Sequence, residues 1–307
     1  MTIASRATGA VLLYAAAYGA SVAVLSAAPE FQAGEALAVM LIFGVGFSLA
    51  AWLATSKAAP LPWTVKAPGR ESGILCGYLV LFAVGFLGWG LTALRAACPS
   101  EPAQSLAILA GKLAAMVVIP AWLFTRLGYT WRDLLAPRAF GRGGRVALLV
   151  IGVLLLGLQL TVGRGPKALA ALEQPVLHVA AMAPLALVWF TIEAGLNEEF
   201  LFRALFQARA SAWLRSETAG IVAMSLIFGL AHAPGYVLRG AHLMEGMAQA
   251  PTALTAAAYA IVVVSPTGLM FGVLWARTRN LWLLAILHGW GDLVPNLASF
   301  VQTWAGP

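Results

Sequence analysis

Long apolar runs separated by short polar loops fill the whole chain of 307 residues. An apolar run of about 18 or more residues is long enough to cross a bilayer as a helix. The pattern predicts an all-α, polytopic integral membrane helix bundle with about 8–9 transmembrane helices. The expected spans are approximately Thr8–Ala28, Ala36–Thr55, Gly73–Leu94, Leu106–Phe124, Val146–Val162, Val176–Glu193, Ala219–Ala233, Leu254–Trp275 and Leu281–Val301.

Composition agrees with this interpretation, because 61% of the residues are hydrophobic and only 10% are charged. Soluble domains carry about 25% charged residues. The longest polar stretch, Arg126–Arg145, is too short to fold separately, so we expect one continuous membrane domain. Cys76 and Cys98 lack a Cys-x-x-Cys partner, which argues against a disulfide framework or a thiolate metal site.

The net charge of +7 does not indicate nucleic-acid binding, because the basic residues are scattered singly over short loops. They follow the positive-inside rule: thirteen fall on one side of the expected spans and four on the other. This asymmetry predicts a cytoplasmic N-terminus and, with nine spans, an external C-terminus. The first span resembles a signal peptide, but its apolar stretch is longer than usual, so we expect a retained helix.

Three charges within six residues interrupt the sixth apolar run: Glu198, Glu199 and Arg203. Each charge at the centre of a transmembrane helix costs roughly 2.5–3.5 kcal/mol, so a partner or a task is expected. Glu199 and Arg203 are four residues apart and can pair on one helix face, whereas Glu198 is rotated by about 100° and can face elsewhere. For Lys112, in the fourth run, we expect the long stem to reach the membrane interface.

Two histidine motifs follow on separate helices. His232 ends the run Phe228–His232, and His288 lies four residues before Asp292 on the expected last helix. At 1.5 Å per residue, Glu198 lies about 16 Å and His288 about 13 Å from the cytoplasmic edge, and His232 matches Glu198 in height across the intervening turn. We therefore expect the carboxylate and the two histidines to meet at one depth.

Such a set suits the activation of water. A carboxylate beside histidine in a low-dielectric pocket can serve as a general base, and a second histidine can stabilise an oxyanion. No serine or cysteine carries the marks of a nucleophile. Glu198, His232 and His288 could also bind zinc with an open position, so metal-assisted and metal-free hydrolysis both remain open.

The three motifs, in this order and on separate helices, resemble those of the CPBP intramembrane proteases, the family of type II CAAX prenyl endopeptidases and their bacterial relatives, also called Abi proteins. They are Glu198–Glu199–x–x–x–Arg203, Phe228–x–x–x–His232 and His288–x–x–x–Asp292. The resemblance covers about Val176–Leu297. It suggests dividing the chain into N-terminal helices without an assigned role, residues 1–145, and a catalytic core, residues 146–307.

The resemblance implies that Glu198 is the general base, that His232 helps to hold the attacking water, and that His288 and Asp292 stabilise the oxyanion. Glu199 and Arg203 would support the site. Two positions depart from the family pattern: Asp292 stands where asparagine is frequent, and Ala204 where glycine often follows the arginine. An ionised carboxylate cannot donate to an oxyanion, so Asp292 could instead orient His288.

We therefore expect an intramembrane endopeptidase, of glutamate or metallo type, in the inner membrane of a bacterium. Its expected partners are the bilayer and a membrane-associated peptide or protein, prenylated CAAX tails being the family's best-known substrates. One alternative is a non-enzymatic scaffold or bacteriocin-immunity protein. Another is a proton-coupled transporter, which intramembrane Glu and His residues can also build, although no internal repeat is evident.

Overall fold

The computed structural model describes residues 3–135, 137–239, 244 and 250–305. The chain is 84% helical, and the described ranges contain no strand. Eight helical segments are long and apolar enough to cross a membrane, so the predicted polytopic all-α fold is confirmed. These segments are Ala4–Leu25, Ala33–Ala54, Pro68–Ala97, Glu101–Arg126, Gly141–Thr161, Val176–Leu214, Glu217–Leu238 and Ala253–Thr278.

The expected ninth span forms helix α16 (Leu281–Ala305), but this helix is not among the eight candidates. His288, Asp292 and Asn296 recur at four-residue spacing along it, and these polar side chains lower its mean hydropathy. The sixth segment extends beyond the expected end at Glu193, continues helically through the Glu198 motif and reaches 39 residues.

The surface of the protein is rich in large apolar side chains. Leu81 is 72% exposed, Trp89 74% and Leu177 85%, and each lies on one of the eight candidate spans. Water-exposed surfaces rarely gather so many apolar groups, whereas lipid tails solvate them well. The exposed leucine and tryptophan side chains therefore fit an integral membrane protein.

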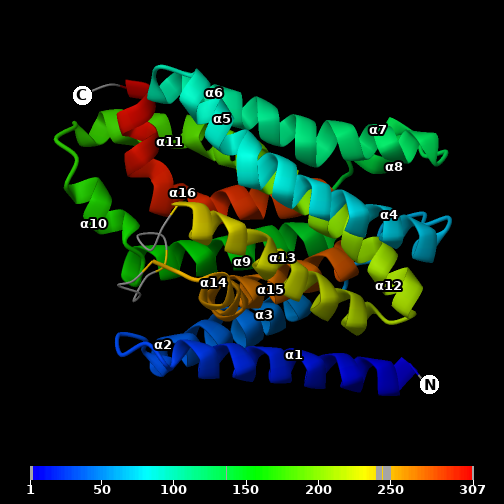
Figure 1. Cartoon of the computed structure of the whole chain (residues 1–307). Helices are drawn as coiled ribbons and strands as arrows, with labels where there is room; N and C mark the ends of the chain where they lie inside the picture. Colours follow the sequence, from blue (N-terminus) through cyan, green and yellow to red (C-terminus); the bar gives the residue numbers. More distant parts are fainter. Residues whose placement is uncertain (1–2, 136, 240–243, 245–249, 306–307) are drawn as a thin grey trace. The chain divides into compact units, whose positions relative to one another are not determined.

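The chain divides into two compact units, each built from three stretches of sequence. The first unit comprises Met1–Leu53, Pro62–Thr92 and Phe202–Arg279. Its helices include α1 (Ile3–Leu25), α2 (Ala33–Val39), η1 (Met40–Phe47), α4 (Pro68–Leu81), η2 (Phe82–Gly90), α12 (Ala208–Leu214), α13 (Glu217–Arg239), α14 (Ala253–Tyr259), η7 (Ala260–Val264) and α15 (Ser265–Thr278). Within this unit α13 packs against α1, α14 and α15 (Figure 1).

The second unit comprises Ala54–Leu61, Ala93–Leu201 and Asn280–Pro307. Its helices include α6 (Glu101–Lys112), η3 (Leu113–Val118), α7 (Ile119–Arg126), α8 (Trp131–Leu135), α9 (Gly141–Thr161), α10 (Gly165–Ala170), α11 (Val176–Phe190), η4 (Thr191–Leu196) and α16. Helices α3 (Ser48–Ala54), α5 (Leu91–Ala97) and η5 (Glu199–Gln207) run from one unit into the other. The expected boundary near residue 145 stays a prediction.

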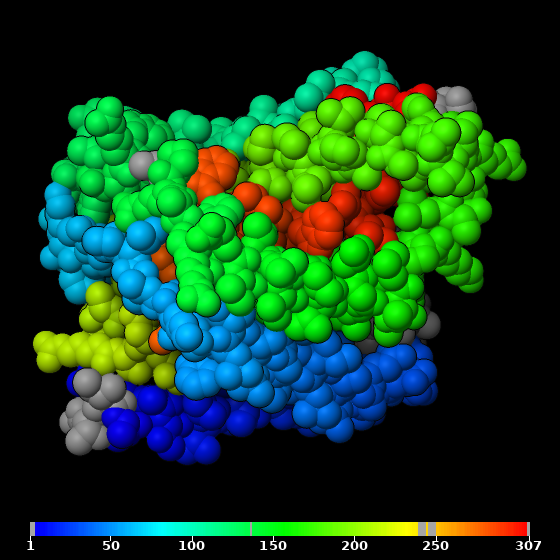
Figure 2. Space-filling model, turned by 180° about the vertical axis from the view of Figure 1, so that it is seen from behind, coloured from blue at the N-terminus to red at the C-terminus, as the bar shows by residue number. Residues whose placement is uncertain are grey.

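Helix α16 is the common packing partner in the second unit. It contacts α9, α10, α11 and η4. Figure 2 shows α16, in red, recessed between the green segments that include α9 and α11. Helix α16 is therefore held by several helices of the same unit.

Candidate active site

The motif that carries the two adjacent glutamates departs from a regular α-helix. The backbone is π-helical over η4 and again over η5, and Asn197 and Glu198 lie between these two segments. A π-turn makes i→i+5 hydrogen bonds, widens the helix locally and is frequent at functional sites. It changes the direction of the side chains from the one that an α-helix of 3.6 residues per turn would give.

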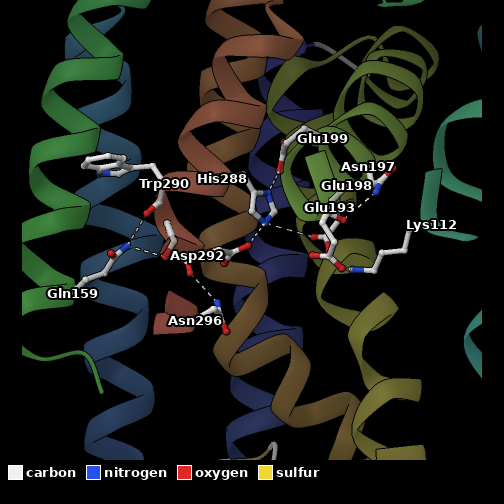
Figure 3. A network of polar contacts seen from close by, with 11 residues as sticks. Lys112, Gln159, Glu193, Asn197, Glu198, Glu199, His288, Trp290, Asp292 and Asn296 are labelled. Atoms are coloured by element: carbon white, nitrogen blue, oxygen red, sulfur yellow. Dashed lines mark hydrogen bonds and ion pairs between the residues drawn. The ribbon is translucent and has the colours of Figure 1, made fainter. Parts of the chain in front are cut away.

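His288 lies among three carboxylates (Figure 3). Its Nδ1 is 2.8 Å from Oε1 of Glu199, a hydrogen-bond distance. Its Nε2 lies 3.7 Å from Oε2 of Glu198 and 3.8 Å from Oδ2 of Asp292. Since an ionised carboxylate can only accept, Nδ1 carries the proton shared with Glu199. The imidazole is thus fixed in orientation, with Nε2 directed at the other two acids.

The three carboxylates differ in their access to solvent. The Glu199 side chain is fully buried, that of Glu198 is 16% exposed and that of Asp292 is 35% exposed. Asp292 is one helical turn beyond His288, and its carboxylate approaches the same imidazole, as its four-residue spacing predicted. Glu199 therefore serves as the buried partner of His288, while Glu198 and Asp292 lie where a small molecule such as water can reach them.

Two glycines allow α16 to approach η4 closely. A Cβ on Gly195 would lie 2.2 Å from the carbonyl oxygen of Ala285, and a Cβ on Gly289 would lie 2.5 Å from the backbone nitrogen of Thr191. Neither distance is open to a side chain, so alanine at either position would push the helices apart. The two glycines, one on each helix, bring His288 within reach of the glutamates.

Helix α9 supports α16 from another side. Pro295 has no N–H and cannot donate to the carbonyl of Gly291, four residues before it. The Gln159 amide donates to that carbonyl at 2.7 Å and to the Trp290 carbonyl at 3.2 Å. The Trp290 indole N–H donates in return to the Gly152 carbonyl at 2.9 Å. These bonds fix the half of α16 that carries Asp292.

Lys112 and Glu193 belong to the same cluster, although no sequence motif predicts a role for them there. Lys112 Nζ lies 2.5 Å from Oε1 of Glu193, so the expectation that the lysine reaches the membrane interface is wrong. Lys112 is near the middle of the segment Glu101–Arg126, too far from either end for an easy exit, and a carboxylate on η4 is close by. Two opposite charges far from the ends of separate apolar runs could have indicated this pair in the sequence.

Arg203 and His232 belong to the first unit. The Arg203 guanidinium is fully buried and lies over the Phe228 ring, 4.3 Å from its centroid. The His232 Nδ1 is 2.9 Å from the Phe228 carbonyl oxygen, and since a carbonyl only accepts, Nδ1 is the donor. Phe228 thus organises both side chains. The predicted Glu199–Arg203 pair and the common depth of His232 and Glu198 stay predictions.

The expected zinc site can be compared with the positions of the described side chains. Over the residues with described positions, no group of three or more His, Cys, Asp and Glu side chains could hold a metal ion. In the second unit, Nδ1 of His288 already donates to Glu199. The expected zinc site at Glu198, His232 and His288 stays a prediction, and the steps described below use only groups of the chain.

The described geometry suits acid–base chemistry. Glu198 offers a carboxylate next to a histidine nitrogen, and His288 is oriented by a buried acid in the manner of a carboxylate–histidine pair. A carboxylate can take a proton from water, and a protonated imidazole can stabilise a developing oxyanion. Both groups lie inside a water-poor environment, where such interactions are strong.

Comparison with known proteins identifies the same part of the chain. Residues 180–294 match the family model described as type II CAAX prenyl endopeptidase Rce1-like. No match is found among curated proteins or among solved structures. The matched segment contains Glu198, Glu199, Arg203, His232, His288 and Asp292. Over residues 180–294 the chain therefore matches the Rce1-like family of type II CAAX prenyl endopeptidases, which confirms the resemblance to CPBP intramembrane proteases indicated by its three motifs.

Proposed function

We propose that the protein is an intramembrane endopeptidase that hydrolyses a peptide bond in a membrane-associated, lipidated substrate of the CAAX type. The observation that carries the proposal is the position of His288, which Glu199 holds through Nδ1 while Nε2 points toward Glu198. The Rce1-like match over the same residues supports this chemistry. Peptide-bond hydrolysis in lipid needs a base for water and a donor for the oxyanion, and these residues can supply both.

In the proposed reaction, Glu198 takes a proton from a water molecule as the water oxygen attacks the scissile carbonyl carbon. The carbonyl π bond breaks, and the negative charge on its oxygen is stabilised by the Nε2–H of protonated His288. The tetrahedral intermediate then collapses: the C–N bond breaks, and Glu198 returns its proton to the leaving amine. The family resemblance adds His232 as a further ligand of the water, an assignment that rests on the sequence motif.

A prenylated substrate would explain why the site lies in a membrane protein. A farnesyl or geranylgeranyl chain on the cysteine of a C-terminal CAAX tail anchors the substrate in the bilayer. The exposed apolar side chains of the helices would keep enzyme and lipid anchor in the same phase. We further propose a cytoplasmic N-terminus and the inner membrane of a bacterium, from the distribution of basic residues and from the family's bacterial members.

Replacement of the proposed base tests the function. Purified protein in detergent should cleave a synthetic peptide in which three residues and a free C-terminus follow a farnesylated cysteine. The products are identified by mass spectrometry. Glu198→Gln removes the base and should lower kcat at least about 100-fold, the typical contribution of general base catalysis. Glu173→Gln, at an exposed position, is the matched control and should cleave at the rate of the unmodified protein.

Three results would count against the assignment. Undiminished cleavage by Glu198→Gln would show that another group activates water. Binding of the peptide without cleavage by the unmodified protein would favour the scaffold or immunity alternative, and pH-driven solute uptake in proteoliposomes would favour the transporter.

A further inference from the structure

A lysine from outside the family-matched segment reaches the glutamate cluster. Lys112 ends α6, in the N-terminal part of the chain, whereas the Rce1-like match begins at residue 180. Its ammonium group contacts the Glu193 carboxylate, and the two side chains are 21% and 19% exposed. Figure 3 shows this pair beside Glu198, and electrostatic interactions of Lys112 extend to Glu198 and Asp292.

Glu193 is placed to influence Glu198 through the helix itself. It precedes Glu198 by five residues, and η4 is π-helical over most of that interval, so the two side chains occupy successive turns of one face. The Asn197 side chain donates to the Glu193 carbonyl at 3.0 Å and further fixes this turn. A contact that holds Glu193 therefore holds the turn from which Glu198 projects.

The positive charge of Lys112 lies close to several negative charges. In the second unit Glu198, Glu199 and Asp292 surround His288, and Glu193 lies beside Glu198. Hydrolysis would add negative charge to this cluster as the oxyanion forms. A fixed positive charge in a low-dielectric site stabilises such charge without reorganisation.

From these contacts we propose that Lys112 and Glu193 form a positioning pair for Glu198, in which the lysine charge also offsets the negative charge that builds up during hydrolysis. This inference rests on the proposed function. It gives Lys112, and with it the N-terminal half of the chain, a part in the reaction.

The test separates a positioning pair from a merely structural ion pair. It compares Lys112→Met, Lys112→Arg, Glu193→Gln and the double variant Lys112→Met/Glu193→Gln with the farnesylated CAAX peptide as probe. Lys112→Met should lower kcat about tenfold or more with KM nearly unchanged, since the charge acts on the transition state. Lys112→Arg keeps the positive charge, so its kcat should stay within about threefold of that of the unmodified protein. Lys167→Met, an exposed lysine of the same unit, is the matched control.

The double variant separates an effect on stability from an effect on catalysis. It removes both charges of the pair, so neither is left without its partner, and its thermal stability should recover even where a single variant does not fold. We expect its kcat to remain about tenfold low. Recovery of kcat together with stability, or unchanged kcat in Lys112→Met, would overturn the inference while the proposed function stands. Absence of cleavage by the unmodified protein would instead reject the proposed function and this inference with it.

Discussion

At the scale of single residues, the site separates its acids by burial and by partner. Glu199 is fully buried and accepts the Nδ1 hydrogen bond of His288, whereas Glu198 and Asp292 approach Nε2 and are partly exposed. A buried carboxylate that orients a histidine fixes both the ring and its tautomer, as in other carboxylate–histidine pairs. The histidine can then present one defined nitrogen to the reaction.

Asp292 offers a direct test of how the oxyanion is held. Asp292→Asn replaces an acceptor with an amide that can donate, so we expect kcat to stay within about threefold of the unmodified protein or to rise. Asp292→Leu removes both options and should lower kcat about tenfold or more. The measurement is the steady-state rate with the farnesylated peptide. Equal losses in both variants would mean that the aspartate acts through its negative charge, by orienting His288.

At the scale of helices, the approach of α16 to η4 depends on glycine. Gly195 and Gly289 leave room for backbone atoms of Ala285 and Thr191 at distances that no Cβ tolerates. In lipid, where apolar side chains gain little by leaving their surroundings, such close backbone contact is a main source of helix association. The geometry around His288 is therefore set partly by residues that carry no functional group.

Gly195→Ala should destabilise the protein by about 1–3 kcal/mol, the usual cost of overpacking, and lower cleavage of the peptide because α16 must shift. The measurement is thermal unfolding in detergent alongside kcat. Gly157→Ala, on α9, is the control: a Cβ there would meet nothing within 4 Å, and the change should leave the protein as stable or slightly more so. A stable and fully active Gly195→Ala variant would contradict the proposed importance of this contact.

The helices could be predicted from the sequence because they depend on local signals. Apolar runs define spans, and the four-residue spacing of His288 and Asp292 placed both side chains on one face. The π-helical turns at η4 and η5 were not predicted, because they depend on packing between helices and have no simple sequence signature. The Lys112–Glu193 pair was missed for a related reason: its members are 81 residues apart and meet only in the folded chain.

At the scale of the whole molecule, the order of the chain and the organisation in space differ. Each compact unit takes three separate stretches, and the residues 54–61 belong to the second unit although their neighbours on both sides belong to the first. Apolar runs predict the spans one after another along the chain. They do not predict this interleaving of the two units, because the interleaving follows from long-range contacts. The predicted depth match of Glu198 and His288 is local to one unit, and there the two side chains do meet.

Orientation in the membrane can be tested with introduced cysteines. In a Cys76→Ser/Cys98→Ser background, Arg132→Cys in α8 should react with a membrane-impermeant maleimide only after the cytoplasmic face is opened, because the basic loop around it is expected inside. Lys167→Cys in α10 should react from the outside in intact cells. Both introduced positions are exposed, so access to the reagent depends on the side of the membrane. Labelling with the opposite sidedness would reverse the predicted topology.

The placement of His288 also has a consequence for biosynthesis. His288 is 89 positions beyond Glu199, its hydrogen-bonding partner. At translation rates of about 5–20 residues per second, the glutamates emerge roughly 4–18 s before the histidine. During that interval the nascent chain would have Glu193, Glu198 and Glu199 in the membrane without the imidazole of His288. A protease assembled in this order would be inert toward its neighbours in the translocation machinery until α16 has been made and inserted.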